Sequence, residues 1–211
     1  ESTRFLCEVL SALSSPPAIL LSASAVGIYG NRGDEILTEA SAPGVGFLAN
    51  LAQDWEASTN PARERGIRVV HLRFGIVLSP KGGALPLLLK IHKWFLGGRL
   101  GSGNQWISWI AGEDVIAIVR FLLKSPDISG PVNVVSPEPI RQKELCSLLS
   151  KITKRSAFMH IPTPLLRLLL GEIATEVFLS SQRVYPRVLL DAGYRFLFPD
   201  LPSALAKLTG S

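Results

Sequence analysis

The sequence predicts an α/β protein, in which a parallel sheet with helices on both faces is followed by a small, mostly helical C-terminal lobe. Ala18–Ser22 is a short continuous apolar run, the pattern of a parallel strand covered on both faces, and Ile67–Phe74 and Pro131–Val135 are expected to be the second and third strands. The segments between them carry apolar residues at helical spacing. Alternation of strands and helices requires crossover connections, which favour a parallel sheet.

The helices are bounded by ordinary start and stop signals. Ser2–Leu13 reads as an amphipathic helix that Ser14–Pro17 ends, and the helical pattern of Val45–Arg65 stops at Gly66. Glu113 and Asp114 suit the positive N-terminus of a helix. The remaining expected elements are helices at Ala84–Leu96, Glu113–Lys124, Arg141–Lys154, Leu165–Gly171 and Arg187–Ala192, and a short strand at Tyr194–Phe198.

The alternation of expected strands and helices gives way to mostly helices after Ser136-Pro137-Glu138-Pro139. We therefore divide it into a sheet domain, residues 1–139, and a helix-rich domain, residues 140–211. The first residue is not a methionine and the first segment already looks helical, so we expect the chain to be part of something longer.

Composition indicates an ordinary globular protein. With 211 residues, 47% of them hydrophobic, the chain can bury one sizeable core. Its longest apolar runs fall far short of the ~20 residues of a spanning helix. Cys7 and Cys146 lie in apolar helical patterns, which predicts free buried thiols in a reducing compartment: the cytoplasm, or an organelle interior such as a plastid.

The net charge of +5 is spread along the sequence, as in Lys90 with Lys93 and Lys151 with Lys154 and Arg155. No nucleic-acid motif accompanies it. We therefore expect a small-molecule substrate as partner, with neither nucleic acid nor membrane, and the charge would suit a phosphorylated cofactor.

The sequence lacks the motifs of several common enzyme and binding classes. The sequence has no Walker A loop and no Gly-x-Ser-x-Gly elbow, and His71, His92 and His160 are too far apart to predict a metal site. His71 lies within an expected strand, which favours a structural role. Sequence order alone leaves a Ser-His-Asp hydrolase open, although no motif favours one.

Two glycine clusters look like ligand loops. Gly44–Ala49 fits Gly-x-Gly-x-x-Ala, but it follows Ser41-Ala42-Pro43 instead of the strand that would aim its amides at a pyrophosphate, so we do not assign it as a dinucleotide fingerprint. Gly97–Gly103 fits either a flexible turn or a lid that faces the substrate.

The most informative segment is Leu20–Gly30. It places the hydroxyls of Ser22 and Ser24 and a glycine turn at the carboxyl end of a strand, where doubly wound sheets bind their ligands. The alternative is a polar strand end that only turns the chain.

The run Ser22-Ala23-Ser24-Ala25-Val26-Gly27-Ile28-Tyr29-Gly30 resembles the strand-end motif of extended short-chain dehydrogenase/reductases. Further matches follow in order and together resemble the atypical epimerase family, including its C-terminal domain of unknown function. They are Trp55-Glu56, Leu72–Leu78, Lys81–Gly83, Gly101–Gln105, Trp109-Ile110 with Asp114, Asn133–Pro137, Gly171-Glu172, Gln182-Arg183, Pro186 and Ala192–Phe196.

This resemblance implies a partial Rossmann-type sheet, NADP as cofactor and an unassigned substrate, possibly a nucleotide sugar. Ser24 would assist proton transfer. The cofactor would lie against Ser22, Ser24, Arg73, Phe74, Gly75, Ile76 and Val77, and the substrate against Gly82, Gly83, Gln105 and Trp109.

The chain departs from the superfamily in its acid and base. A tyrosine followed four residues later by lysine is expected near Phe47 and Leu51, where both side chains are apolar, and Tyr29 is followed at that spacing by Gly33. The reaction would need another group, and Tyr29 is a candidate with a packed ring as the equal alternative. Ala111 and Gly112 also stand where the family has polar residues, notably a histidine.

A second departure concerns the strand, glycine-rich turn and helix that open the family's fold, which we expect to be absent here. Losing two or three amide bonds to phosphate would cost roughly two to six orders of magnitude in NADP affinity. The strand at Ala18–Ser22 would also keep an unpaired edge that invites self-association.

Three hypotheses follow: an NADP-dependent oxidoreductase or epimerase, a noncatalytic NADP-binding or regulatory protein such as a division protein, and a truncated inactive product.

Overall fold

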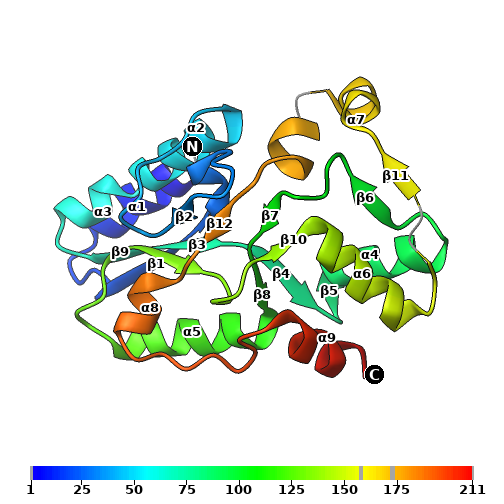
Figure 1. Ribbon diagram of the computed structural model, residues 1–211. Coiled ribbons are helices and arrows are strands. Elements are labelled where there is room, and N and C mark those ends of the chain that lie inside the picture. Colours follow the sequence, from blue (N-terminus) through cyan, green and yellow to red (C-terminus); the bar gives the residue numbers. More distant parts are fainter. Residues whose placement is uncertain (1, 157–158, 172–173, 211) are drawn as a thin grey trace.

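The computed structural model describes residues 2–156, 159–171 and 174–210. Its main sheet has three parallel strands in the order β1 (Ile19–Ala25), β3 (Arg68–Phe74), β9 (Gly130–Val134) (Figure 1). The register sets Ser22 opposite His71 and Ser24 opposite Arg73. The expected strands and their parallel pairing are confirmed.

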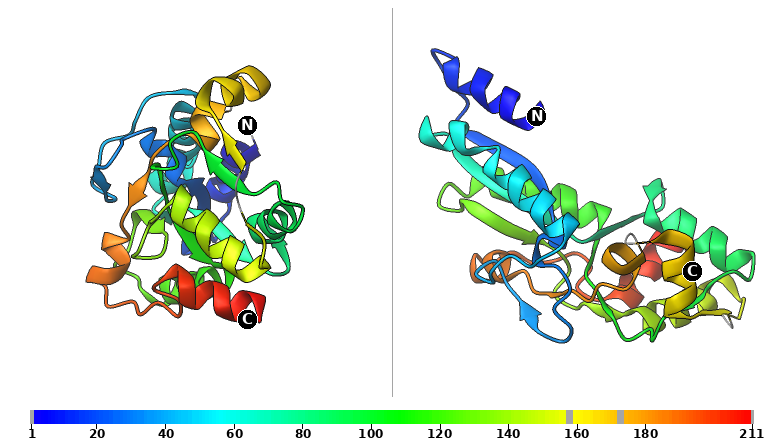
Figure 2. Two further views of the ribbon diagram at one scale, coloured as in Figure 1. Left: turned by 45° about the vertical axis from the view of Figure 1, so that its right-hand side comes forward. Right: turned by 90° about the horizontal axis from the view of Figure 1, so that it is seen from above.

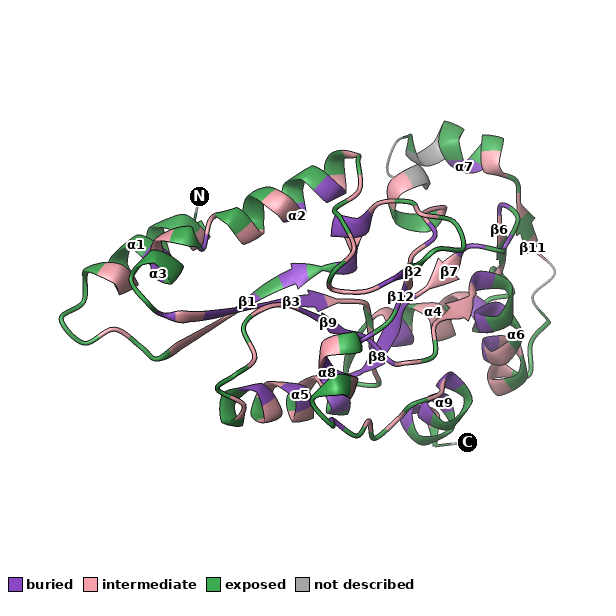
Figure 3. Cartoon of the chain, turned by 60° about the vertical axis from the view of Figure 1, so that its left-hand side comes forward, coloured by how far each residue is buried: buried purple, intermediate pink, exposed green. Residues whose placement is uncertain are grey.

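Helices cover both faces of this sheet. On one side lie α1 (Ser2–Ala12), α2 (Phe47–Ala57) and α3 (Asn60–Glu64), and on the other α5 (Gly112–Lys124) and α8 (Arg187–Asp191) (Figures 1 and 3). The larger core packs Val70 and Val132 of the sheet against Ile118 of α5 and Leu189 of α8. The α/β class and its covered sheet are therefore as expected.

The long helix expected over Val45–Arg65 is two helices. The hydroxyl of Thr59 donates to the carbonyl of Glu56 at 2.7 Å between them, and Pro61 lies in the first turn of α3. Because proline has no N–H, it cannot bond the carbonyl of Ala57, so the first helix ends there.

A second group of elements lies at the other end of the molecule (Figure 2). Strand β4 (Ile76–Ser79) pairs with β5 (Gly82–Gly83) and β8 (Trp109–Ala111). Helices α4 (Ala84–Lys93), α6 (Gln142–Thr153) and α9 (Leu201–Thr209) pack around them. Leu85 and Trp109 share this core with Leu149 and Leu205, so segments from both sides of residue 139 build it.

Three short strand pairings join segments from before and after residue 139. They are β2 (Ile36–Leu37) with β12 (Arg183–Val184), β6 (Gly98–Leu100) with β11 (Met159–Ile161), and β7 (Trp106–Ile107) with β10 (Ile140–Arg141). The expected turn at Gly97–Gly103 is thus partly a strand. A Cβ on Gly98 would lie 1.8 Å from the carbonyl oxygen of Met159, so this close pairing requires glycine. Also present are α7 (Thr163–Leu170), the 3-10 turn η1 (Val26–Tyr29) and the π-helical turn η2 (Ala174–Phe178).

The strand expected at Tyr194–Phe198 is wrong. The amides of Leu197 and Phe198 donate to the carboxylate of Asp114 at 2.9 and 3.0 Å, and the Tyr194 hydroxyl donates to it at 3.0 Å. Asp114 is fully buried. Because one side chain takes the backbone donors that a neighbouring strand would need, the segment is irregular. Helix α9, which was not expected, begins at the N-cap Asp200.

Cys7 and Cys146 are free and buried, as expected. Among the described residues, no helix combines the length and apolar character needed to cross a membrane.

Candidate functional site

The carboxyl end of β1 brings the two predicted serines under helix α2. Ser22 and Ser24 are buried, whereas Ala23 and Ala25 alternate with them on the exposed face. This alternation is the period of a strand, so only one of the two side-chain sets can face α2.

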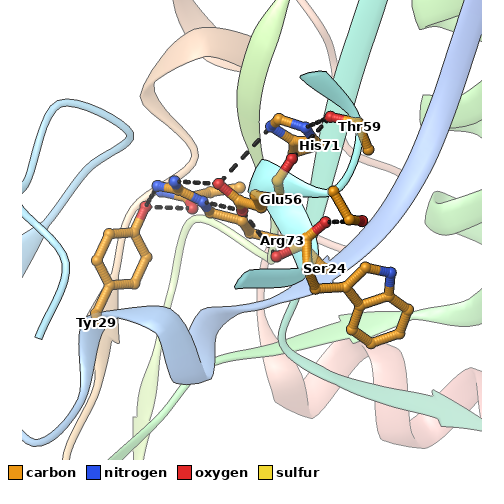
Figure 4. Close-up of polar contacts among 9 residues, drawn as sticks. Ser24, Tyr29, Glu56, Thr59, His71 and Arg73 are labelled. Atoms are coloured by element: carbon orange, nitrogen blue, oxygen red, sulfur yellow. Dashed lines mark hydrogen bonds and ion pairs between the residues drawn. The ribbon is translucent and has the colours of Figure 1, made fainter. Parts of the chain in front are cut away.

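Glu56 of α2 is the centre of the polar contacts there (Figure 4). Its carboxylate accepts a hydrogen bond from the Ser24 hydroxyl at 2.7 Å and two from the Arg73 guanidinium, at 2.8 Å each. The two-point contact with arginine is the strong, directional kind. Helix α2 is thereby attached to the ends of both β1 and β3.

In this cluster, charge pairing shifts the pKa values of Glu56 and Arg73 more than burial does. Burial raises the pKa of Glu56, but hydrogen bonds from Arg73 and Ser24 hold it below its usual value of 4.5. Burial lowers the pKa of the Arg73 guanidinium, yet Glu56 and Tyr29 hold it above the usual range. Both groups are therefore charged at neutral pH, and Ser24 faces a carboxylate.

Tyr29 is fully buried at the end of η1. Its hydroxyl donates to Asn133 Oδ1 at 2.7 Å and accepts from Arg73 Nη1 at 3.0 Å. Burial raises the pKa of Tyr29, although Arg73 and Asn133 oppose this. A hydroxyl enclosed in this way favours the packed ring over the proton donor, and its catalytic role stays a prediction.

His71 lies on the same face of β3. Its Nε2 is 2.9 Å from the Thr59 hydroxyl, and its Nδ1 is 3.7 Å from Glu56 Oε2. Burial lowers the pKa of His71, an effect that Glu56 partly opposes. These contacts agree with the structural role expected from the sequence.

A cavity of about 170 Å³ adjoins the loop that follows β1. It is lined by Gly27, Gly30, Asn31, Leu48, Glu176 and Gln182, among others. Glu176 belongs to η2, and its carboxylate accepts from the amides of Phe47 and Leu48 at 2.8 Å each. Among the described residues of this lining, it is the ionisable side chain.

Sequence reasoning missed Glu176, since it lies 129 residues from Phe47. The available signal was the absence of a Ser, Thr, Asp or Asn at the helix start: the N-cap of α2 is Gly46, which has no side chain to offer. A Cβ on Gly46 would lie 2.9 Å from Glu176 Oε1, so glycine makes room for the carboxylate. The amides of the Gly44–Ala49 cluster thus bind a side chain of the protein itself.

The joint between β3 and β4 carries the other predicted cofactor residues, Arg73–Val77. A Cβ on Gly75 would lie 2.6 Å from the carbonyl oxygen of Ser108, so glycine is required where the chain passes from one sheet to the next. Only Arg73 of this segment joins the Glu56 cluster. The cofactor role of Ser22, Ser24 and Arg73–Val77 stays a prediction.

The predicted substrate residues lie elsewhere. Gly82 and Gly83 are exposed on β5, while Trp109 is buried on β8 and donates to the carbonyl of Glu138. Gln105 donates to the carbonyl of Phe178 at 3.0 Å and so steadies the segment of Glu176. None of the four lines the cavity. Among the described residues, no group of His, Cys, Asp and Glu is placed to hold a metal.

A parallel sheet covered on both faces, with polar groups at the carboxyl ends of its strands, defines an α/β protein with a Rossmann-like fold. Comparison with known proteins identifies the family within this class. Residues 161–208 match the domain of unknown function DUF1731. The epimerase family protein Mb2239 of Mycobacterium bovis is 40% identical over 204 residues, which cover 96% of this chain and 68% of that protein.

Two solved structures are similar. One is the nucleoside-diphosphate sugar epimerase from Corynebacterium glutamicum, with a TM-score of 0.81 and 37% identity over 99% of this chain and 41% of that one. The other is human epimerase family protein SDR39U1 (isoform 2) with NADPH, with a TM-score of 0.91 and 28% identity over 100% of this chain and 71% of that one. The chain belongs to the epimerase family of extended short-chain dehydrogenase/reductases, with its C-terminal DUF1731 domain.

Proposed function

We propose that this chain supplies the nicotinamide end and the substrate cavity of an NADP-dependent epimerase or oxidoreductase. The observation that carries the proposal is the cluster of Ser24, Glu56 and Arg73 at the ends of two parallel strands, together with a cavity at the loop after β1 that the Glu176 carboxylate lines. The solved human relative carries NADPH, which supports NADP as the cofactor.

The residues present fit the ring end of such a cofactor. Ala23 and Ala25 are exposed on the face of β1 opposite Ser24, and their small side chains would let a flat ring approach the strand end from that side. Bound NADP would accept or supply hydride at a hydroxyl-bearing carbon. The helix N-terminus at Phe47 and Leu48 already binds Glu176, so support for the phosphates is expected from segments that the longer relatives carry beyond the matched region.

Within the cavity, Glu176 is the side chain suited to move a proton, in place of the absent Tyr-Lys pair. Asn31, Ser180 and Gln182 surround it with groups that can hydrogen-bond hydroxyls. This chemistry suits a polyhydroxylated substrate, of which a nucleotide sugar is one class. The free buried thiols support a reducing compartment, the cytoplasm or an organelle interior such as a plastid.

One observation favours a second candidate, a noncatalytic NADP-binding or regulatory protein. The hydroxyls of Ser24 and Tyr29 are both engaged by neighbours, and the Glu176 carboxylate already accepts hydrogen bonds from two backbone amides. A site so fully satisfied can bind a ring without exchanging protons.

The deciding experiment is calorimetric titration of the protein in its longest natural form, and of the 211-residue chain, with NADPH and NADH. We expect the longer form to prefer NADPH and the 211-residue chain to bind weakly. A turnover screen with nucleotide sugars and small carbonyls then separates the two candidates. If the longer form does not bind NADPH at millimolar concentration, both candidate functions are rejected.

If the longer form turns over a substrate, Glu176→Gln is expected to lower kcat by about 10²-fold or more, because an amide cannot carry the proton. Its affinity for NADPH should stay within about twofold of the unchanged protein. Glu138→Gln, at an exposed position outside the cavity, is the control. Equal turnover by both variants would exclude Glu176 as the proton carrier.

A further inference from the structure

Three segments at one end of the molecule contain basic residues and no acidic ones, although Glu144 of α6 and Asp200, the N-cap of α9, lie next to them in the sequence. Segments 80–112, 145–171 and 201–211 contain no Asp or Glu and nine basic side chains: Lys81, Lys90, Lys93, Arg99, Lys151, Lys154, Arg155, Arg167 and Lys207. With +5 overall and +9 here, the remaining segments carry a net charge of −4. We call these three segments the basic lobe.

The fold gathers charges that look dispersed along the sequence. Helices α4, α6 and α9 lie side by side at the end of the molecule away from α1 and α3 (Figures 1 and 2). Arg155, next to α6, lies over the ring of Phe95, next to α4, at 4.7 Å. The packing of these helices places basic residues from three separate segments at one end of the molecule, which raises the positive potential there.

A cavity of about 540 Å³ opens within the basic lobe, between α4, α6 and α9. This volume is within the range of about 300–1,000 Å³ that small-molecule sites occupy. Pro86, Leu89, Ile152 and Leu208 form apolar walls, and Lys90 and Lys93 line the same space. The cavity therefore combines apolar surface with two positive charges.

Lys90 and Lys93 are exposed at the end of α4. In the part of the chain that the structure describes, neither forms an ion pair. Lys90 and Lys93 fall in the last turn of α4, where cations favour the helix dipole. The dipole accounts for the charges but not for the apolar cavity beside them.

We propose that this cavity binds a small anionic amphiphile, a molecule with one carboxylate or phosphate group and an apolar body. The anionic group meets Lys90 and Lys93, and the apolar body lies on Leu89, Ile152 and Leu208. A free inorganic anion would leave the apolar walls unused, and a neutral apolar molecule would leave both ammonium groups unused. The site is separate from the Glu56 cluster, so it does not depend on the proposed NADP chemistry.

The test is calorimetric titration with decanoate, with decanamide as the neutral analogue and acetate as the anion without an apolar body. We expect decanoate to bind at one site per chain and both analogues to bind at least about tenfold more weakly. If decanamide binds as tightly as decanoate, the lysines do not bind the anionic group. If acetate binds as tightly as decanoate, the apolar walls do not bind the apolar body.

Matched variants locate the site. Lys90→Gln with Lys93→Gln is expected to weaken decanoate binding at least about tenfold. Lys151→Gln with Lys207→Gln removes the same charge from exposed positions outside the cavity and should leave binding unchanged. All four positions are on the surface, and unchanged circular dichroism verifies the fold. An equal loss in both pairs, or binding only to anionic phospholipid vesicles, would overturn the proposal.

Discussion

Glu56 shows how a single side chain can attach three segments of the chain. It joins α2 to the ends of β1 and β3 through Ser24 and Arg73, in a setting where both charges are largely withdrawn from water. Such a pair contributes little net stability when intact, but either partner alone is costly because its charge remains buried. The cluster therefore constrains which substitutions this end of the sheet tolerates.

We expect Glu56→Gln to lower the free energy of unfolding by about 3–5 kcal/mol, because Arg73 would stay buried without a counter-charge. The double variant Glu56→Gln with Arg73→Met should recover much of that loss. Urea unfolding measures both, with Glu64→Gln at an exposed site of α3 as the control. A double variant less stable than the single one would contradict this account.

His71 predicts a pH dependence of stability. Its pKa in the folded protein is lowered from the usual 6.5, chiefly by burial, so the unfolded chain takes up a proton first as the pH falls. The contribution of His71 to the free energy of unfolding is therefore complete above pH 6.5. It declines below that pH, by at most about 1.4 kcal/mol per pH unit. His71→Gln should flatten this part of the profile, whereas His160→Gln, at an exposed residue, should not.

At the scale of elements, helix α2 depends on the C-terminal domain for its beginning. Gly46 offers no capping side chain, and Glu176 supplies the missing acceptor across 129 residues of sequence. The DUF1731 segment thereby helps to position the helix that carries Glu56. A lobe boundary drawn along the sequence does not describe this dependence.

Glu176→Ala is expected to destabilise the protein by about 0.5–2 kcal/mol, the usual cost of losing an N-cap. Amide hydrogen exchange should rise at Phe47 and Leu48 more than elsewhere in α2, because their acceptor is gone. Glu144→Ala, which removes the carboxylate that caps α6, is a matched control that should leave α2 unaffected. Unchanged exchange at Phe47 and Leu48 would show that the contact does not hold in solution.

The outer edge of β1 is a further element-scale feature. Among the described strands only β3 pairs with it, and the neighbouring α1 exposes Phe5 to 69%. We propose that this edge supports self-association, and expect Ala23→Lys to shift the chain toward monomer in sedimentation equilibrium. Val45→Lys, at a site 89% exposed, is the control. Monomers at every concentration in the unchanged chain would refute the proposal.

At the scale of the whole molecule, sequence patterns anticipated the sheet well. Each strand of the main sheet is rich in apolar residues, because burial on both faces leaves a compositional signal. Ser24 and Arg73 were identified through the resemblance, and the register brings them together. The patterns failed at Tyr194–Phe198, where Asp114 takes the backbone donors, and they did not indicate the charge of the basic lobe.

The sequence by itself determined the fold class, the family and the two buried thiols, since these depend on local periodicity and on motifs that stay in order along the chain. Only the tertiary structure decided that Glu176 caps α2, that Tyr29 is enclosed, and that Lys90 and Lys93 share a cavity with Ile152 and Leu208. Each of these joins residues distant in sequence. Such contacts follow from how elements pack, which the spacing of residue types along one segment does not encode.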